Sequence, residues 1–140
     1  MDAFDSDVII YAAVPDHPLG RRVLALFRQA GRQPAGAGSV LLLPEILGNP
    51  LRDGQTSEVR ILAGLLARVD LRPVDRATAD LATALASRYG LRAADATHLA
   101  TAVALGADRF ITNNQRDFSQ AITEVKVVYP GDLTDGTRAG

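Results

Sequence analysis

The chain has 140 residues, of which 47% are hydrophobic and 22% are charged, and its formal net charge is −1 at pH 7. This length is typical of a single domain, and the composition excludes a disordered or fibrous chain. Cysteine is absent, which excludes a disulfide framework, a zinc–thiolate site and a cysteine nucleophile.

The sequence also indicates where the protein works. It contains no apolar run of the roughly 18 residues that a membrane-spanning helix needs. Its first residues, MDAFDSD, are acidic, whereas a secretory signal peptide starts with basic residues. We therefore expect a cytoplasmic protein without membrane contact. The net charge is unlike the basic footprint of a stand-alone nucleic-acid-binding domain.

The first forty residues mix clear and ambiguous patterns. Residues 8–11 (VIIY) have the composition of a buried strand, but they could equally form a helix after a strand over 3–5. The turn-rich segment 31–38 predicts a connection, and residues 40–43 (VLLL) predict a strand that ends at Pro44. Between them, helical spacing of apolar residues predicts an amphipathic helix with Val23, Leu26, Phe27 and Ala30 on one face.

The second half of the chain alternates helical and strand patterns. Apolar spacing predicts helices at 62–69, at 81–89 ending at Gly90, and at 94–105 ending at Gly106, with strands at 109–112 and 125–129. Alternation of this kind predicts a parallel sheet covered by helices on both faces. We expect the polar segment 131–140 to fray.

Acidic residues lie at the junctions between predicted strands and the helices that follow them, namely Asp5, Asp7, Glu45, Asp95 and Asp117. Ligands of open α/β sheets bind beyond the carboxyl ends of the strands, so we expect these side chains to share a cleft. Several carboxylates in one cleft need a cation to neutralise them. Oxygen ligands without cysteine suit Mg²⁺ or Mn²⁺.

Each acid also has a structural interpretation, which the sequence leaves open. Asp5, Asp7 and Asp117 could cap helices, and Glu45 and Asp95 could favour the dipole of a helix from its first turn.

The predicted helix at 94–105 adds two observations. Asp95 is in line with Leu99, Ala102 and Gly106 on the inward face, where an isolated carboxylate would be costly to bury. His98 follows Asp95 by one turn, and packing is a more common role than catalysis for a histidine in this position.

Arginines form a second stripe on the first long helix. Arg21, Arg28 and Arg32 are spaced at i, i+7 and i+11. Such a stripe is most often a solvated helix face, and its functional alternative is a contact with phosphate or with an acidic partner.

Four segments together resemble the motifs of PIN-domain nucleases. FDSDVIIYA resembles the family's opening motif and LLLPEIL its second acidic motif. YGLRAADATHLATAVALGAD resembles the long third motif, and RFITNNQRDF resembles the closing strand. Their order and gaps cover residues 2–130, and the size of the chain is nearest to VapC-like toxins of toxin–antitoxin pairs.

The resemblance implies one domain over residues 1–130, an α/β fold in which a three-layer α/β/α sandwich encloses a mostly parallel five-stranded sheet. It implies that Asp5 ends the first strand and that residues 8–11 begin a helix. It also implies a Mg²⁺- or Mn²⁺-dependent endoribonuclease that acts on RNA, forms a homodimer and binds a cognate antitoxin.

The resemblance also implies roles for particular residues. Asp5, Glu45 and Asp95 correspond to catalytic, metal-binding acids. The family often has aspartate at a fourth position, where this chain has Asn114, and Asp117 is the nearest acid that could supply the fourth charge. Thr112 and Asn113 are implied to orient the metal's water.

Two other interpretations stay open at this stage. Asn114 also fits an inactive PIN scaffold that only binds partners. Thr112 and Lys126 fit, loosely, a receiver-type phosphoacceptor domain.

Overall fold

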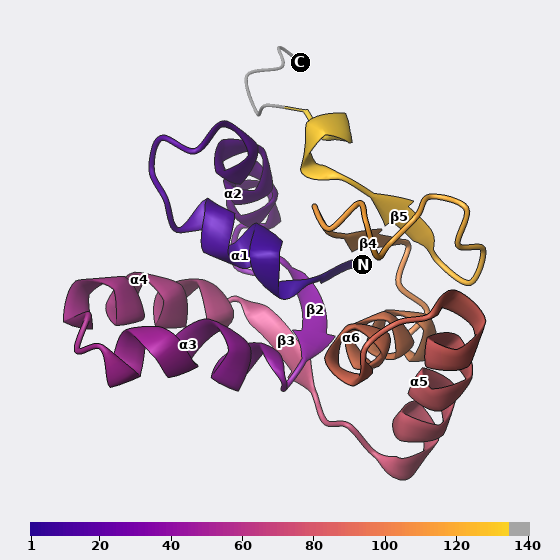
Figure 1. Ribbon diagram of the computed structural model, residues 1–140. Helices are drawn as coiled ribbons and strands as arrows, with labels where there is room; N and C mark the ends of the chain where they lie inside the picture. The colour runs from indigo at the N-terminus through magenta and orange to yellow at the C-terminus, as the bar shows by residue number, and fades with distance from the viewer. Residues whose placement is uncertain (135–140) are drawn as a thin grey trace.

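Five strands form one sheet, and all neighbouring pairs in it are parallel. The computed structural model describes residues 1–134 (Figure 1). The strands are β1 (Asp2–Phe4), β2 (Gly36–Ser39), β3 (Val69–Arg72), β4 (Arg109–Ile111) and β5 (Lys126–Val128). Their order is β3-β2-β1-β4-β5, so the chain winds outward from β1 to β3 and then returns to the other side of β1.

Six helices cover the two faces of this sheet (Figure 1). They are α1 (Ser6–Ala12), α2 (Pro18–Ala30), α3 (Leu42–Arg52), α4 (Thr56–Leu66), α5 (Arg76–Tyr89) and α6 (Ala93–Ala104). Within the described residues, none of these helices is long and apolar enough to cross a membrane. The short 3-10 helix η1 (Pro130–Asp132) begins the segment predicted to fray, and residues 135–140 of that segment lie outside the described residues.

Two apolar cores, one on each face of the sheet, establish the three-layer architecture. Successive side chains of a strand point to opposite faces, and the central strands follow this rule. Phe4 and Ile111 pack among the side chains of α1–α4. Their neighbours Ala3 and Phe110 pack instead among those of α5 and α6. The predicted α/β/α sandwich with a five-stranded sheet is therefore confirmed.

The strand predicted at 40–43 is wrong, because β2 lies four residues earlier and the chain enters α3 at Leu42. All four residues of β2 (GAGS) are buried. A Cβ atom on Gly36 would lie 2.6 Å from the Asp2 carbonyl oxygen, and one on Gly38 would lie 2.5 Å from Leu42 Cδ1. Backbone packing thus requires glycine at position 36, and a side chain at position 38 would displace that of Leu42. With these glycines, the sequence of this segment resembles a turn.

The end of the helix predicted at 62–69 is also wrong, because α4 ends at Leu66 and Val69 begins β3. As the edge strand of the sheet, β3 is only partly buried, so it lacks the apolar run of a central strand. Helix α3 was predicted only as a first turn around Glu45, without a range. It carries Pro44 in its first turn, where proline is tolerated, and Pro50 inside it.

The remaining elements agree with the sequence in type, although α4 and α5 begin five or six residues before their predicted starts, at Thr56 and Arg76. The opening segment forms β1 and then α1, so residues 8–11 are helical. Helix α5 ends at Gly90, which adopts a left-handed conformation with φ +67°, as expected for glycine at this position. Helix α6 and strands β4 and β5 lie within one or two residues of their predicted ranges.

Candidate functional site

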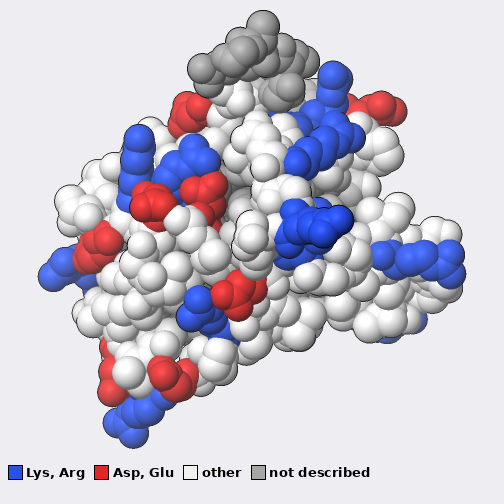
Figure 2. Space-filling view, turned by 180° about the vertical axis from the view of Figure 1, so that it is seen from behind, with Lys and Arg blue, Asp and Glu red and all other residues white. Residues whose placement is uncertain are grey.

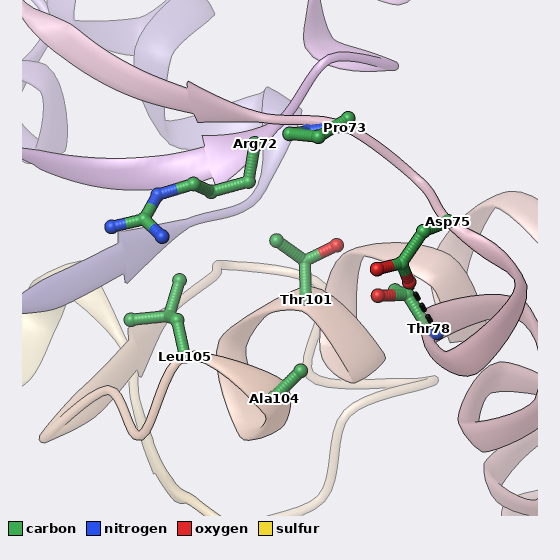
Figure 3. A pocket seen from close by; sticks show the side chains of 7 residues that line it. All are labelled: Arg72, Pro73, Asp75, Thr78, Thr101, Ala104 and Leu105. Atoms are coloured by element: carbon green, nitrogen blue, oxygen red, sulfur yellow. Dashed lines mark hydrogen bonds between the residues drawn. The ribbon is translucent and has the colours of Figure 1, made fainter.

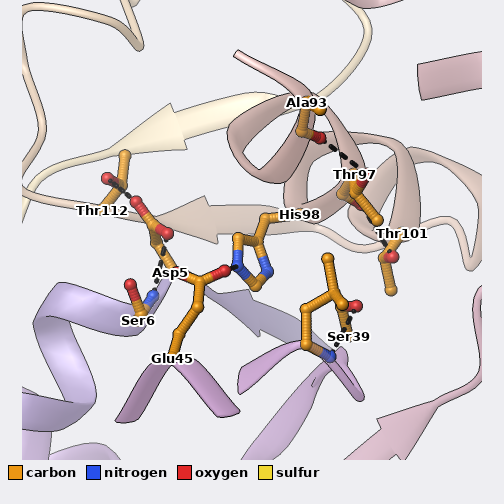
Figure 4. A network of polar contacts seen from close by, with 10 residues as sticks. Asp5, Ser6, Ser39, Glu45, Ala93, Thr97, His98, Thr101 and Thr112 are labelled. Atoms are coloured by element: carbon orange, nitrogen blue, oxygen red, sulfur yellow. Dashed lines mark hydrogen bonds and ion pairs between the residues drawn. The ribbon is translucent and has the colours of Figure 1, made fainter. Parts of the chain in front are cut away.

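Asp5 is the most buried acid of the chain's candidate site. It directly follows β1 and is only 4% exposed. Its Oδ1 accepts a hydrogen bond from Ser6 N at 2.8 Å, and its Oδ2 accepts one from Thr112 Oγ1 at 2.7 Å (Figure 4). Asp5 is therefore the N-cap of α1, and it also lies at the carboxyl ends of the strands, called here the acidic edge. Burial raises the pKa of the Asp5 carboxyl.

The position of Asp5 follows from the winding of the sheet. Strands β1 and β4 are neighbours although more than one hundred residues separate them. The order of the strands reverses beside them, and such switch points are where doubly wound sheets bind ligands. Asp5 follows β1 and Thr112 follows β4, so their hydrogen bond lies at this point.

Glu45 and His98 approach the same edge from opposite layers (Figure 4). Glu45 is in the first turn of α3, and His98 is on α6. His98 Nε2 lies 2.6 Å from Glu45 Oε1. This hydrogen bond lowers the pKa of Glu45. Burial alone would lower the pKa of His98, but the bond to Glu45 and the charge of Asp5 outweigh it and raise that pKa.

Asp95 stands in the first turn of α6 and is partly buried. Burial is the main reason that its pKa is raised, followed by the negative charges of Asp5 and Asp117. Leu99 and Ala102, which share its helix face, are fully buried. Asp95 follows helix α5 and not a strand as predicted, whereas Asp5 and Asp117 follow β1 and β4. The negative charges of Asp5 and Asp117 nonetheless act on Asp95 beyond the carboxyl ends of the strands.

The loop after β4 places Asn114 and Asp117 side by side. Asn114 Nδ2 donates to Asp117 Oδ2 at 3.0 Å, and Asn114 Oδ1 accepts from Asp117 N at 3.2 Å. The backbone N of Asn114 donates to Thr112 Oγ1 at 3.1 Å. The amide of Asn114 is thus occupied by Asp117, whose charge acts on Asp95.

Asp7 belongs to this edge too, as one of the acids expected in the shared cleft, although the family resemblance implied no metal-binding role for it. Its Oδ2 accepts a hydrogen bond from Asn113 N at 3.1 Å. Among the residues described, its buried Oδ1 has no hydrogen-bond partner. Burial and the charge of Asp5 raise the pKa of Asp7 to about 7. The signal available in the sequence was the spacing of two aspartates at positions 5 and 7.

Of the three arginines in the predicted stripe, Arg32 lies away from the acids. Arg21 and Arg28 are exposed on α2, and Arg32 is exposed beyond its end. Arg32 lines a hollow of about 250 Å³ with Arg68, next to the starts of β2 and β3, whereas the acids follow the ends of strands. Basic and acidic side chains are interspersed over the face shown in Figure 2.

A further hollow, of about 200 Å³, lies between the end of β3 and helices α5 and α6 (Figure 3). Its walls include Arg72, Thr78 and Thr101, but none of the candidate acids. It is therefore distinct from the carboxylate cluster.

The donor chemistry of the acidic edge fits a hard divalent cation. Among residues 1–134, no three His, Asp or Glu side chains converge closely enough to hold a metal ion as they stand. The available donors are nonetheless carboxylate oxygens, which Mg²⁺ and Mn²⁺ prefer. Asp5 and Asp95 repel each other, and among the described residues one oxygen of Asp7 has no partner. Both destabilise the metal-free fold, and a bound cation would relieve both.

Comparison with known families agrees with this geometry. The PIN domain family model matches residues 3–122. The chain belongs to the PIN-domain family. PIN domains are generally nucleases, so the nuclease class predicted from the sequence is supported at the level of the family. The receiver-type interpretation is wrong, since that fold has strand order 2-1-3-4-5, unlike the order observed.

Solved structures add a close neighbour to this PIN domain. Four solved chains match it. One of them is described as a toxin–antitoxin complex from Klebsiella pneumoniae, with 28% sequence identity and a TM-score of 0.67. The alignment covers 93% of this chain and 98% of that one. No curated protein matches the sequence.

Proposed function

We propose that this PIN domain is a Mg²⁺- or Mn²⁺-dependent endoribonuclease and the toxin of a toxin–antitoxin pair. The proposal rests mainly on the cluster of acids at the switch point between β1 and β4. Asp5 is buried there, and the negative charge of Asp117 acts on Asp95. The similarity to a chain from a toxin–antitoxin complex over nearly the whole of both chains supports the toxin role.

The proposed roles follow from the contacts of each residue. Asp5, Asp95 and Glu45 would hold the cation, and Asp117 would add the fourth charge. A bound Mg²⁺ or Mn²⁺ would polarise the scissile phosphate and lower the pKa of a water, the chemistry that hydrolysis of a phosphodiester needs. Thr112 fixes the Asp5 carboxylate through its hydroxyl. Asn113 donates its backbone N–H to Asp7 and so fixes the loop after β4 against α1.

The proposed substrate is single-stranded or looped RNA. The chain carries a net charge of only −1, so a cation held by four acids leaves the rest of the molecule positive. Such a surface admits a phosphate backbone without tight binding. A recessed metal reaches an exposed backbone more readily than one within a duplex.

We further propose a cytoplasmic homodimer that is held inactive by its cognate antitoxin. The antitoxin partner is supported by the neighbouring structure's description as a toxin–antitoxin complex. An acidic site and an exposed arginine-bearing helix on one molecule suit a partner with charges of both signs.

An inactive scaffold is the second candidate, and a specific observation favours it. Asn114 replaces the aspartate that the family often has, and its amide is bound to Asp117 rather than free. A scaffold of this kind would bind the antitoxin but would neither bind Mn²⁺ nor cleave RNA.

Cleavage of a fluorophore–quencher RNA and of a DNA with the same base order tests the proposal. The assay is run with Mg²⁺, with Mn²⁺ and with EDTA. The variants Asp5→Asn and Asp95→Asn should each abolish the metal-dependent cleavage of RNA. Asp80→Asn is the matched control, since Asp80 is an exposed acid on α5 that pairs with Arg76.

Three results would separate the candidates. Cleavage by the wild type and the control, but not by the site variants, supports the endoribonuclease. Equal cleavage by the Asp5 and Asp95 variants and the wild type would show that the activity lies elsewhere. Absence of cleavage by the wild type, together with retained antitoxin binding, would favour the scaffold.

A further inference from the structure

His98 has an unusual position for a buried polar side chain. Its side chain is 0% exposed, and it lies on α6 one turn beyond Asp95. It contacts the carboxylate of Glu45, which belongs to α3 in the opposite helical layer (Figure 4). The contact thus crosses the carboxyl edge of the sheet, and it joins two residues separated by 53 positions.

The two ring nitrogens of His98 have different surroundings. Nε2 is 2.6 Å from Glu45 Oε1. Among the described residues, Nδ1 is buried and has no hydrogen-bond partner. A proton on Nδ1 alone would leave a buried donor unsatisfied and place a lone pair against the carboxylate. The geometry therefore places an N–H at Nε2, where it donates to Glu45.

Glu45 needs such a donor more than Asp5 does. Its side chain is 34% exposed, and glutamate is among the side chains with the most rotamer freedom to lose on ordering. Asp5, in contrast, is already held by Ser6 N and Thr112 Oγ1. Of the three acids in the proposed ligand set, Glu45 is the one whose orientation depends on a partner from another layer.

We infer that His98 is a positioning residue, which holds the Glu45 carboxylate toward Asp5 and Asp95 by donating its Nε2–H. This inference rests on the proposed function, because it assigns Glu45 to the cation site. His98 is not itself a ligand in this scheme, since Nε2 faces Glu45 and Nδ1 faces the protein interior. Partners that orient ligating side chains typically change metal affinity roughly 10–100-fold when they are removed.

The test compares His98→Leu, which keeps the bulk but loses the donor, with His98→Gln, whose amide can still donate to Glu45. Mn²⁺ affinity is measured by the electron paramagnetic resonance signal of free Mn²⁺. We expect the dissociation constant to rise roughly tenfold in His98→Leu, and His98→Gln to recover most of that loss. In a Glu45→Gln background, His98→Leu should cause little further change.

A second α6 variant controls for disturbance of the helix. Thr101 is buried one turn beyond His98, and its hydroxyl donates only to the Thr97 carbonyl at 2.9 Å. Thr101→Val should leave Mn²⁺ affinity unchanged. Equal losses in Thr101→Val and His98→Leu, or no loss in His98→Leu, would overturn the positioning role.

Failure of the proposed function is distinguishable from failure of this inference. If the wild type binds no Mn²⁺, the cation site is refuted. Metal-free crystal structures of the wild type and of His98→Leu then test whether His98 orients Glu45. An ordered Glu45 carboxylate in the wild type that becomes disordered in His98→Leu sustains the positioning role. The same Glu45 rotamer in both structures would refute it.

Discussion

Thr112 Oγ1 donates a hydrogen bond to Asp5 Oδ2 over 2.7 Å, and this contact joins the carboxyl ends of two adjacent parallel strands. Both residues are buried. The same hydroxyl oxygen accepts a hydrogen bond from the backbone N of Asn114. One threonine therefore orients the most buried acid of the site and the loop that carries Asn114.

Replacement of Thr112 by valine tests this double role. Thr112→Val keeps the shape of the side chain but leaves a buried carboxylate oxygen and an amide without their partner. We expect the free energy of unfolding to fall by about 1–3 kcal/mol and metal-dependent cleavage to fall by at least tenfold. Urea denaturation and the RNA assay measure the two effects.

Thr83→Val is the control for this substitution. The Thr83 hydroxyl also donates a hydrogen bond, to the Ala79 carbonyl at 2.9 Å, but on the exposed face of α5. Its loss should cost less than 1 kcal/mol. If the two valine variants lose the same stability and keep the same activity, Thr112 has no special role.

The pH dependence of stability should reveal the cost of burying Asp7 close to the charge of Asp5. Asp7 has a pKa of about 7 in the folded protein, raised by burial and by Asp5, against an ordinary value of 3.8. Between these values the folded chain binds more protons than the unfolded chain, so metal-free stability falls as pH rises. Above pH 7 the loss from this group is complete.

Asp7→Asn removes this titration and keeps an oxygen for the Asn113 N–H. We expect it to raise the melting temperature of the metal-free protein at pH 8 by roughly 5 °C, and by less at pH 5. Scanning calorimetry at both pH values measures the difference, with Asp80→Asn as the exposed control. A gain of the same size at both pH values would contradict the assigned pKa.

The loop after β4 offers a test of which residue supplies the fourth negative charge of the proposed metal site. If Asp117 supplies it, Asp117→Asn should weaken Mn²⁺ binding more than Asn114→Ala does. Asn114→Asp should place a second carboxylate against Asp117, in place of the donor Nδ2. We expect this variant to be less stable without metal and to bind Mn²⁺ more tightly.

Isothermal titration calorimetry with Mn²⁺ ranks these three variants. A larger loss in Asn114→Ala than in Asp117→Asn would move the fourth position back to Asn114.

The sequence predicts α6, β4 and β5 to within one or two residues, but it misplaces β2 for an identifiable reason. Strand signals depend on branched and aromatic side chains. In β2 the backbone of Asp2 approaches so closely that glycine is required at position 36, and at position 38 a side chain would meet that of Leu42. Glycine, however, signals a turn. Edge strand β3 is hidden for the opposite reason, because its partial exposure removes the apolar run.

The site was predictable where a residue's role depends on its own strand or helix. Asp5, Glu45 and Asp95 each stand at the start of a helix, and topology gathers such positions at one edge. The partners of Glu45 and Asp7 were not predictable. His98 and Asn113 reach these acids through contacts that span 53 and 106 positions, and neither contact leaves a local pattern in the sequence.

The contact between α1 and α2 should tolerate no side chain at Gly20. A Cβ atom there would lie 2.0 Å from the Tyr11 carbonyl oxygen. Gly20→Ala should therefore force the two helices apart and cost about 1–3 kcal/mol.

Gly64 is the matched position for this test. It lies inside α4, and a Cβ atom there would meet nothing within 4 Å. Gly64→Ala should stabilise the fold by roughly 0.5–1 kcal/mol, because alanine favours the helix. Thermal melts of both variants should move in opposite directions, and a shift of Gly20→Ala to higher temperature would contradict the close packing.

The exposed arginines of α2 provide the last prediction, which concerns the proposed antitoxin. Arg21 and Arg28 lie seven residues apart and are exposed on this helix. Helical partners often place an apolar face in a groove and pair their polar ends with charges at its rim. We expect Arg21→Glu with Arg28→Glu to weaken antitoxin binding at least tenfold and to leave Mn²⁺ affinity unchanged.

A pull-down with the protein encoded beside this chain's gene, followed by calorimetry, measures the loss. The control is Arg76→Glu with Arg88→Glu, which changes the net charge equally but on α5, where both arginines are exposed. Because exposed ion pairs contribute little to stability, both double variants should stay folded. If the α2 variant binds the antitoxin as tightly as the α5 variant does, the arginines of α2 form a solvated helix face and the partner docks elsewhere.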